Sequence, residues 1–307
     1  MNSKKKQALS YALVSVLFWS TVATAFKLTL RGMNNAQLLF YSSLTSFVVL
    51  FFFAYRNSKD ELKQFFKIKS VRKNIILGLI NPFVYYLVLF KAYSILPAQE
   101  AQPINLTWPL ILSILSAVFL KQKLSGKTIM GLLISFFGVV VIATHGDILS
   151  LQFYNLVGVL LAISSSFIWS AYWILNLLDK REESIKLFGS FFFGSIFITI
   201  YIFFFDSFGP IEFKFVLGAV YIGLFEMGIT FFLWLKALSL SEDKAKTSTI
   251  VYLFPVISLS FIALVLGEKL YASSIFGLVL ILGGILFQQA GVFKRKFSPA
   301  NSATTNQ

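Results

Sequence analysis

The sequence predicts an all-α polytopic membrane protein in which ten transmembrane helices form two inverted five-helix repeats. Three observations support this prediction: the composition, the number of long apolar segments, and an internal duplication. Hydrophobic residues make up 57% of the 307-residue chain and charged residues only 13%. A soluble domain of this length has more charged and less apolar surface. The alternating apolar and polar pattern of a transmembrane β-barrel is absent from the sequence.

Ten apolar segments are long enough to cross a bilayer. A helix needs about 20 apolar residues to span a hydrocarbon core of about 30 Å. Segments of this kind run over residues 8–30, 36–55, 72–91, 98–120, 127–144, 154–177, 186–206, 213–235, 246–267 and 271–290. The residues from Phe297 onward are rich in Ser, Ala, Thr and Asn, and a disordered tail is expected there.

An internal duplication divides the chain into halves. Lys91-Ala92-Tyr93-Ser94 corresponds to Lys236-Ala237-Leu238-Ser239 at an offset of 145 residues. The offset becomes 146 for the pairs Pro109 and Pro255, Lys123 and Lys269, Leu124 and Leu270, Gly131 and Gly277, and Gly138 and Gly284. Trp19-Ser20 pairs with Trp169-Ser170 at an offset of 150. The duplication predicts a first repeat over residues 1–145, a second over 146–293 and a cytoplasmic tail over 294–307.

Basic residues are concentrated in alternate loops, which predicts the orientation in the membrane. Of the 27 Lys and Arg residues, 22 fall on the side of the termini, four on the other side, and Lys27 lies inside a span. By the positive-inside rule, both termini are cytoplasmic, and the plasma (inner) membrane is the expected location. Because each repeat has an odd number of spans, the repeats have opposite orientations, as in many secondary transporters. The net charge of +14 then faces anionic lipid headgroups, and no nucleic-acid partner is expected.

Several classes of chemistry are excluded by residues that are missing or rare. The chain has no Cys and a single His, His145, which excludes disulfides, Cys-ligated metals and a multi-histidine metal site. No Walker A phosphate loop, His-Glu-x-x-His motif or nucleophile elbow occurs. We therefore expect no enzyme activity, no metal and no cofactor. His145 is expected to be an ordinary interfacial residue.

Glu226 is the sharpest candidate for a functional residue. It lies near the middle of the eighth span, and its repeat counterpart, at an offset of 145, is Asn81 in the third span. Pro82 follows Asn81 and cannot donate a backbone hydrogen bond, so the third span is expected to be interrupted there. A carboxyl group at this depth is disfavoured in its charged form, which makes Glu226 a candidate proton carrier. A structural hydrogen bond or ion pair is the alternative.

Lys27 lies in the last third of the first span, and two interpretations of it stay open. Its four-carbon stem can bring the ammonium group to the outer face of the membrane. Alternatively, the side chain faces a cavity and pairs with Glu226 or with a substrate carboxylate. On the second interpretation, Lys27 is a candidate substrate-binding residue.

The fourth and sixth spans carry further candidates for substrate binding. Asn105 and Trp108 share a helix face and suit a zwitterionic or aromatic small molecule. In the sixth span, Trp169, Tyr172, Trp173 and Asn176 follow one another at i, i+3, i+4 and i+7. An aromatic stripe of this kind is also typical of packing, but the Asn176 amide is unsuited to lipid.

Two further expectations concern packing and exposure. Glu100 lies nearer the outer rim than Asn105, and a solvated role is expected for it. Gly131 with Gly138, and Gly277 with Gly284, stand seven residues apart on one helix face, which predicts close helix contacts.

These motifs resemble the drug/metabolite transporter superfamily in its ten-span EamA branch. The resemblance rests on Phe18-Trp19-Ser20 with Lys27, and on Pro255, Gly267-Glu268-Lys269-Leu270, Gly277 and Gly284. The first half departs from this pattern, since Lys121-Gln122-Lys123-Leu124 replaces the Gly-Glu-basic-Leu sequence. Asn105-Leu106-Thr107-Trp108-Pro109 resembles the Asn-x-x-Trp-Pro motif of the aromatic amino-acid exporter members. The resemblance implies a central cavity between the halves, with binding roles for Asn105 and Trp108 and, by position alone, for Glu226.

The expected function is therefore that of a secondary transporter of a small-molecule substrate. Export of aromatic or neutral amino acids by alternating access is the first reading. The alternatives are proton-coupled efflux of drugs or organic cations, and a membrane subunit that transports nothing. The sequence leaves the oligomeric state open, a homodimer included.

Overall fold

The computed structural model describes residues 3–57, 59–63, 65, 67–119, 121, 125–149, 153–241, 247 and 250–296. Every regular element in these residues is a helix. Eight helical segments are long and apolar enough to cross a membrane, and two shorter apolar helices, Ile250–Leu266 and Ala272–Gln288, correspond to the ninth and tenth predicted spans. The all-helical, ten-span fold predicted from the apolar segments is confirmed. The residues from Phe297 onward, Lys123, Leu124 and the predicted start of the ninth span at residue 246 lie outside the described residues.

The first half contains five spans built from nine helical elements. They are α1 (Ser3–Thr29), α2 (Asn35–Asn57), α3 (Lys59–Lys63), α4 (Ile68–Gly78), η1 (Leu79–Val84), α5 (Tyr85–Ile95), α6 (Ala98–Asn105), α7 (Trp108–Phe119) and α8 (Gly126–Ala143). The second half contains α9 (Leu156–Leu178), α10 (Glu183–Phe205), α11 (Phe213–Phe225), α12 (Ile229–Leu240), η2 (Ile250–Leu253), α14 (Phe254–Phe261), η3 (Ile262–Leu266) and α15 (Ala272–Lys296). With five spans in each half, the second half enters the membrane from the side opposite to the first, so the repeats are inverted.

The third span of each half is broken near its middle. In the first half, Asn81 leaves the helical conformation, with φ −142° and ψ 121°, immediately before Pro82. This confirms the interruption predicted from Pro82, which has no N–H to donate. In the second half, α11 ends at Phe225, and Gly228 takes φ −116° and ψ −93° before α12 begins. This second break is not predicted from the sequence. It interrupts the helical hydrogen bonds of the backbone beside Glu226.

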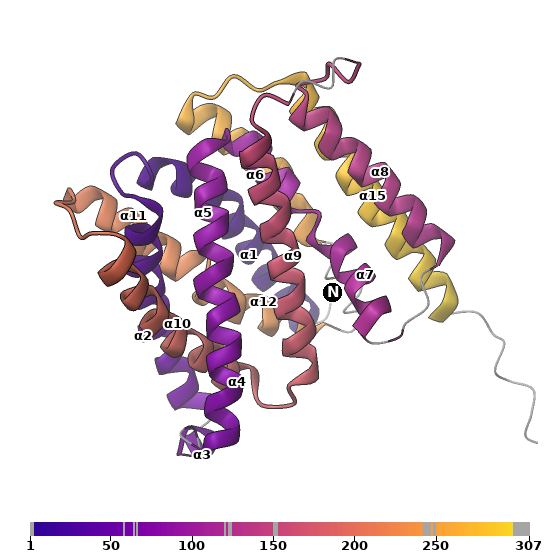
Figure 1. Ribbon diagram of the computed structural model, residues 1–307. Coiled ribbons are helices and arrows are strands. Elements are labelled where there is room, and N and C mark those ends of the chain that lie inside the picture. The colour runs from indigo at the N-terminus through magenta and orange to yellow at the C-terminus, as the bar shows by residue number, and fades with distance from the viewer. Residues whose placement is uncertain are drawn as a thin grey trace, which may run out of the picture.

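The helices pack in the pattern that a two-fold relation between the halves requires. The first spans, α1 and α9, each pack against the third and fourth spans of the other half: α1 contacts α12 and α14, and α9 contacts α5 and α7. The second spans, α2 and α10, pack on each other, as do the fifth spans, α8 and α15. Figure 1 shows α8 and α15 side by side at one edge of the molecule, and α2, α10 and α11 at the opposite edge. Each half therefore covers apolar surface that the other half cannot cover by itself.

Glycines bring α8 and α15 into close contact. A Cβ atom built on Gly131 would lie 2.5 Å from the carbonyl oxygen of Gly284, and one built on Gly138 would lie 2.7 Å from that of Gly277. Ser135, between the two glycines of α8, donates to the carbonyl oxygen of Ile281 over 3.0 Å. The close helix contact predicted from the glycine spacing is confirmed, and it joins the two halves. Small residues allow such an approach because the backbones, not the side chains, touch.

Candidate functional site

A cavity of about 480 Å³ lies where the two halves face each other, and residues from both halves line it. Its walls come from α1, η1, α5, α6 and α7 of the first half and from α9, α10, Glu226 after α11, α12, η2, α14 and α15 of the second. The lining extends along the helices from mid-depth to Ser113, Glu183 and Gln288. These three residues lie towards the end of the molecule that carries the connection between α2 and α4 and the connection between α9 and α10. We call this end, at which α1 begins and α15 ends, the basic end.

Corresponding positions of the two repeats face the cavity. At offsets of 150 in the first spans, 145 in the third and 146 in the fourth, the lining pairs are Trp19 with Trp169, Val22 with Tyr172, Ala23 with Trp173, Phe26 with Asn176, Asn81 with Glu226, Tyr86 with Phe231, Leu89 with Trp234, Asn105 with Val251, Leu106 with Tyr252 and Trp108 with Phe254. The approximate two-fold axis that relates the two halves therefore passes through the cavity. The two members of a pair usually differ in chemistry, so the symmetric backbone encloses an asymmetric set of side chains.

Glu226 presents the carboxylate at mid-depth in this cavity. It follows the last residue of α11, and the hydroxyl group of Tyr86, at the start of α5, donates a hydrogen bond to it over 3.2 Å. Thr230 donates to the carbonyl oxygen of Phe225 over 2.5 Å, which satisfies a backbone acceptor freed by the break. The carboxylate is thus held by one phenol and otherwise faces the cavity. The arrangement is compatible with both interpretations of Glu226, as a proton carrier and as a structural hydrogen-bond partner, because the residue has a partner and also lines the cavity.

Asn81, the repeat counterpart of Glu226, also lines the cavity. Its side chain is buried, and no hydrogen-bond partner within the described residues reaches its Oδ1 atom. The same holds for Oε1 of Gln102 and Nε1 of Trp173, which belong to the same cavity wall. Buried polar groups without a partner are costly, so these two acceptors and one donor are polar groups of the cavity wall that the described residues leave unsatisfied.

The other polar candidates line the cavity but are tied to protein partners. The Asn105 amide donates to Oγ of Ser165 in α9 over 2.8 Å, which joins the two halves. The Asn176 oxygen accepts from Nζ of the buried Lys186 over 2.9 Å. Both amides therefore have a packing role in this arrangement, whatever they contribute to binding.

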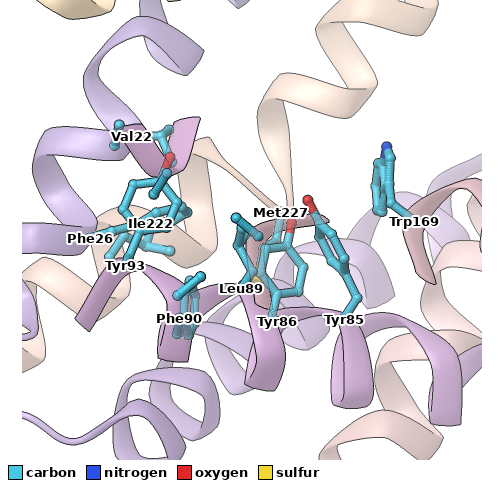
Figure 2. Close-up of a cluster of buried hydrophobic side chains, with 14 of the residues drawn as sticks. Val22, Phe26, Tyr85, Tyr86, Leu89, Phe90, Tyr93, Trp169, Ile222 and Met227 are labelled. Atoms are coloured by element: carbon cyan, nitrogen blue, oxygen red, sulfur yellow. The ribbon is translucent and has the colours of Figure 1, made fainter. Parts of the chain in front are cut away.

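The aromatic candidates form one continuous wall. Trp108 stacks on Trp173 with ring centres 6.4 Å apart, and the ring centres of Trp169 and Tyr172 are 5.6 Å apart. Tyr85, which the sequence analysis does not single out, stacks on Trp169 at 4.6 Å. Figure 2 shows Tyr85, Tyr86, Leu89 and Tyr93 projecting from one helix, with Trp169 facing Tyr85 from another.

Lys27 is placed away from this site. It is not among the lining residues, and its Nζ atom donates to the carbonyl oxygens of Tyr93 and Leu96, both at 2.9 Å. The last carbonyl groups of α5 have no partner within their own helix, and the Lys27 ammonium satisfies two of them. In this structure Lys27 therefore neither pairs with Glu226 nor lines the cavity, and a role for it in substrate binding stays a prediction.

The expectation that Glu100 is solvated is wrong. Its side chain is 4% exposed, and one oxygen lies 2.7 Å from Nε2 of His145. The His145 ring is stacked between Tyr154 and Tyr271, with ring centres 4.0 and 4.7 Å away. His145 is therefore part of a packed polar cluster and not an ordinary interfacial residue.

Sequence reasoning missed several lining residues, and the repeat offsets are the signal that could have found them. Once Asn81 and Glu226 are paired, the next turns bring Tyr86 and Phe231, then Leu89 and Trp234. The charges of the lining were also missed. Among the described lining residues, Glu183 and Glu226 are acidic and none is basic. Glu183 pairs with Lys186 at 2.7 Å, so Glu226 is the lining carboxylate for which the described residues provide no ion-pair partner.

The chain matches the model of the EamA-like transporter family over residues 6–144 and again over residues 156–288. It belongs to the EamA-like transporter family. The two matches cover the two halves, so each five-span half is one copy of the family's unit. The protein is accordingly a membrane transporter, not an enzyme, with multiple membrane spans and a small-molecule substrate.

Distant relatives share almost the whole length of this EamA chain. A protein of Archaeoglobus fulgidus described as an uncharacterized transporter is 26% identical over 279 residues, which cover 89% of this chain and 95% of that protein. A probable amino-acid metabolite efflux pump of Escherichia coli is 25% identical over 303 residues, covering 93% of this chain and 95% of that protein. One solved crystal structure shares the fold, with a TM-score of 0.66 at 19% identity over 95% of this chain and 99% of that chain.

Proposed function

We propose that this EamA protein is a secondary transporter of the plasma membrane that exports small metabolites by alternating access, with aromatic or neutral amino acids as the first substrate class. The observation that carries the proposal is the cavity lined by corresponding residues of two inverted repeats. Inverted repeats can exchange conformations, so that one central site opens first to one side and then to the other. The concentration of basic residues supports a cytoplasmic position for the basic end and for both termini.

The chemistry of the wall supports an aromatic substrate. Tyr85, Trp108, Trp169 and Trp173 offer faces for stacking, and ring pairs contribute about 0.5–1.5 kcal/mol beyond the area that they bury. Glu226 lies on the wall of the same cavity, and its carboxylate suits an ammonium group. The relative in Escherichia coli whose printed name includes amino-acid metabolite efflux adds weight to this substrate class.

A specific observation favours a second candidate, the efflux of organic cations. The described lining contains no Lys, Arg or His that could pair with a substrate carboxylate, whereas Glu226 is unbalanced by a cation. Aromatic rings around a carboxylate attract a cationic nitrogen both by charge and by cation–π contact. On this reading an amine binds better than the amino acid with the same side chain.

Glu226 is proposed to couple substrate movement to protons. The carboxyl group lines the cavity and has one neutral donor, Tyr86, as its partner in the described chain. A proton and a cationic substrate would compete for it, because either one removes the cost of an isolated charge at this depth.

Counterflow in proteoliposomes tests the proposal and separates the candidates. Vesicles with purified protein are preloaded with phenylalanine, tryptophan, threonine, phenethylamine, tryptamine or a sugar, and uptake of the labelled compound is followed. Selective exchange of the aromatic amino acids supports the first candidate, and selective exchange of the two amines supports the second. Exchange of the sugar alone, or of no compound by folded protein, contradicts both.

A further inference from the structure

The end of the molecule opposite the basic end is closed by a set of hydrogen bonds between the two halves. Glu268 follows η3 in the second half, and its carboxylate accepts from the backbone N–H of Ala98 at 3.1 Å and of Gln99 at 3.5 Å. These N–H groups begin α6 of the first half, where they have no partner within the helix. The carboxylate therefore caps the start of a helix that belongs to the other repeat, with favourable charge at the positive end of that helix.

Gln99 adds two more bonds across the same boundary. Its amide nitrogen donates to the carbonyl oxygen of Lys269 over 3.0 Å, and its amide oxygen accepts from the N–H of Tyr271 over 2.8 Å. The side chain is 1% exposed, so these bonds are shielded from water. We call the contacts of Glu268 and Gln99 the latch.

Neighbouring groups hold both sides of the latch in place. Lys27 binds the carbonyl groups of Tyr93 and Leu96, in the chain that leads into α6. Glu100, one residue after Gln99, pairs with His145, whose ring stacks on Tyr271 in the second half. The latch is thus the centre of a partly buried polar cluster drawn from α1, α6, the residues after α8 and the loop before α15.

The position of the latch relates it to the cavity. Gln102 and Asn105 lie one and two turns further along α6 and line the cavity, whose lining continues towards the basic end. For the cavity to open at the opposite end instead, the start of α6 has to separate from residues 268 to 271. Each bond of the latch would break in that movement.

We infer that Glu268 is a positioning residue that holds this end of the transport cavity closed through α6. The inference rests on the proposed alternating access. It also gives a physical meaning to one sequence difference between the two repeats. The counterpart of Glu268, at an offset of 146, is Gln122. An amide carries no charge and caps a helix less strongly than a carboxylate. Of these two counterparts only Glu268 carries a charge, and its capping of α6 favours the conformation that is closed at the latch.

Site-directed labelling tests the inference without knowledge of the substrate. The chain has no Cys, so Leu89→Cys, in the cavity wall, gives a single thiol whose reaction with a membrane-impermeant reagent reports access to the cavity. Leu149→Cys, at a position 98% exposed between α8 and α9, shows which membrane face carries the latch end. Intact cells and inverted vesicles then provide the two faces.

Glu268→Ala in the Leu89→Cys background is expected to raise the labelling rate from the latch side about tenfold and to lower it from the basic end, because losing hydrogen bonds to a charged group has an effect of this size. Glu268→Gln should give a smaller shift in the same direction, since it keeps an acceptor. Gln99→Ala, on the other side of the latch, should act as Glu268→Ala does. Glu212→Gln is the matched control, because that loop carboxylate at the same end is 68% exposed and pairs with Lys214.

Faster labelling from both faces would indicate loosened structure and would overturn the inference, as would unchanged labelling in both latch variants. If no compound is exchanged in counterflow, the labelling rates of Leu89→Cys can still be measured and compared. The positioning role and the transport proposal can therefore fail separately.

Discussion

The hydroxyl group of Tyr86 donates a hydrogen bond to the carboxylate of Glu226 across the boundary between the two halves, at 3.2 Å. Tyr86 lies one turn after the break at Asn81, and Glu226 lies at the corresponding break of the other half. The two interrupted spans thus meet at the depth where a charge is hardest to hold. A charge there needs a partner, and Tyr86 is a partner that leaves room for a second one.

Glu226→Gln is expected to abolish any dependence of transport on pH that comes from this carboxyl group, because the amide does not titrate. Exchange of amines should fall by about tenfold, while exchange of neutral substrates should change less. Counterflow at several pH values measures both effects. Glu212→Gln, on an exposed loop, is the control and should leave the profile unchanged. A variant that keeps the pH profile of the parent protein would remove Glu226 from the coupling step.

Tyr86→Phe removes the hydrogen bond but keeps the ring. The expected effect is a two- to tenfold change in exchange rate, since one hydrogen bond contributes about 0.5–1.5 kcal/mol. The pH dependence should persist with a displaced midpoint, because Glu226 still titrates. Loss of the pH dependence in this variant would show that the phenol itself takes part in proton movement.

Gly131→Ala should weaken the contact between α8 and α15, because the new methyl group would lie 2.5 Å from the carbonyl oxygen of Gly284. The expected cost is about 1–3 kcal/mol, the usual range for overpacking. Thermal unfolding in detergent measures the change. Gly283→Ala is the matched control on the same helix pair, because no atom lies within 4 Å of its built Cβ. Equal stability of the two variants would contradict the close contact.

Asp179 provides a pH-dependent contribution to stability at the basic end. It is 4% exposed, with Arg181 at 2.6 Å and Lys73 at 3.1 Å. Burial favours the neutral acid, but the hydrogen bonds from Arg181 and Lys73 outweigh it and lower the pKa of the carboxyl group to about 2. Since the folded value lies below the unfolded value of about 3.9, the contribution is complete above about pH 4 and disappears as the pH falls through about 2.

Asp179→Asn should therefore lower stability at pH 7, and the difference from the parent protein should shrink towards pH 2. Denaturation in detergent at several pH values measures it. The exposed Asp60, which pairs with Lys63 on the surface, gives a control in Asp60→Asn, expected to change stability little. A penalty for Asp179→Asn that does not change with pH would mean that packing, not charge, accounts for it.

The sequence by itself determined the helical class, the number of spans and the two repeats. These follow from the length of apolar segments and from residue offsets, which are properties of the chain read locally. It also determined the break at Pro82 and a close helix contact at Gly131 and Gly138, since a missing N–H and a missing side chain have the same consequence in any surroundings. Seven of the candidate site residues line the cavity, and their roles in binding or coupling stay predictions: Asn81, Asn105, Trp108, Trp169, Tyr172, Asn176 and Glu226.

Only the tertiary structure decided where the long polar side chains point and which partners they meet. Lys27 reaches the end of α5 instead of Glu226, and Glu100 meets His145 instead of water. Tyr86 and Glu226 are 140 residues apart in the chain, and Glu268 is 170 residues from Ala98. Such contacts depend on how one repeat is placed against the other, and side chains with several rotatable bonds reach whichever buried partner that placement offers.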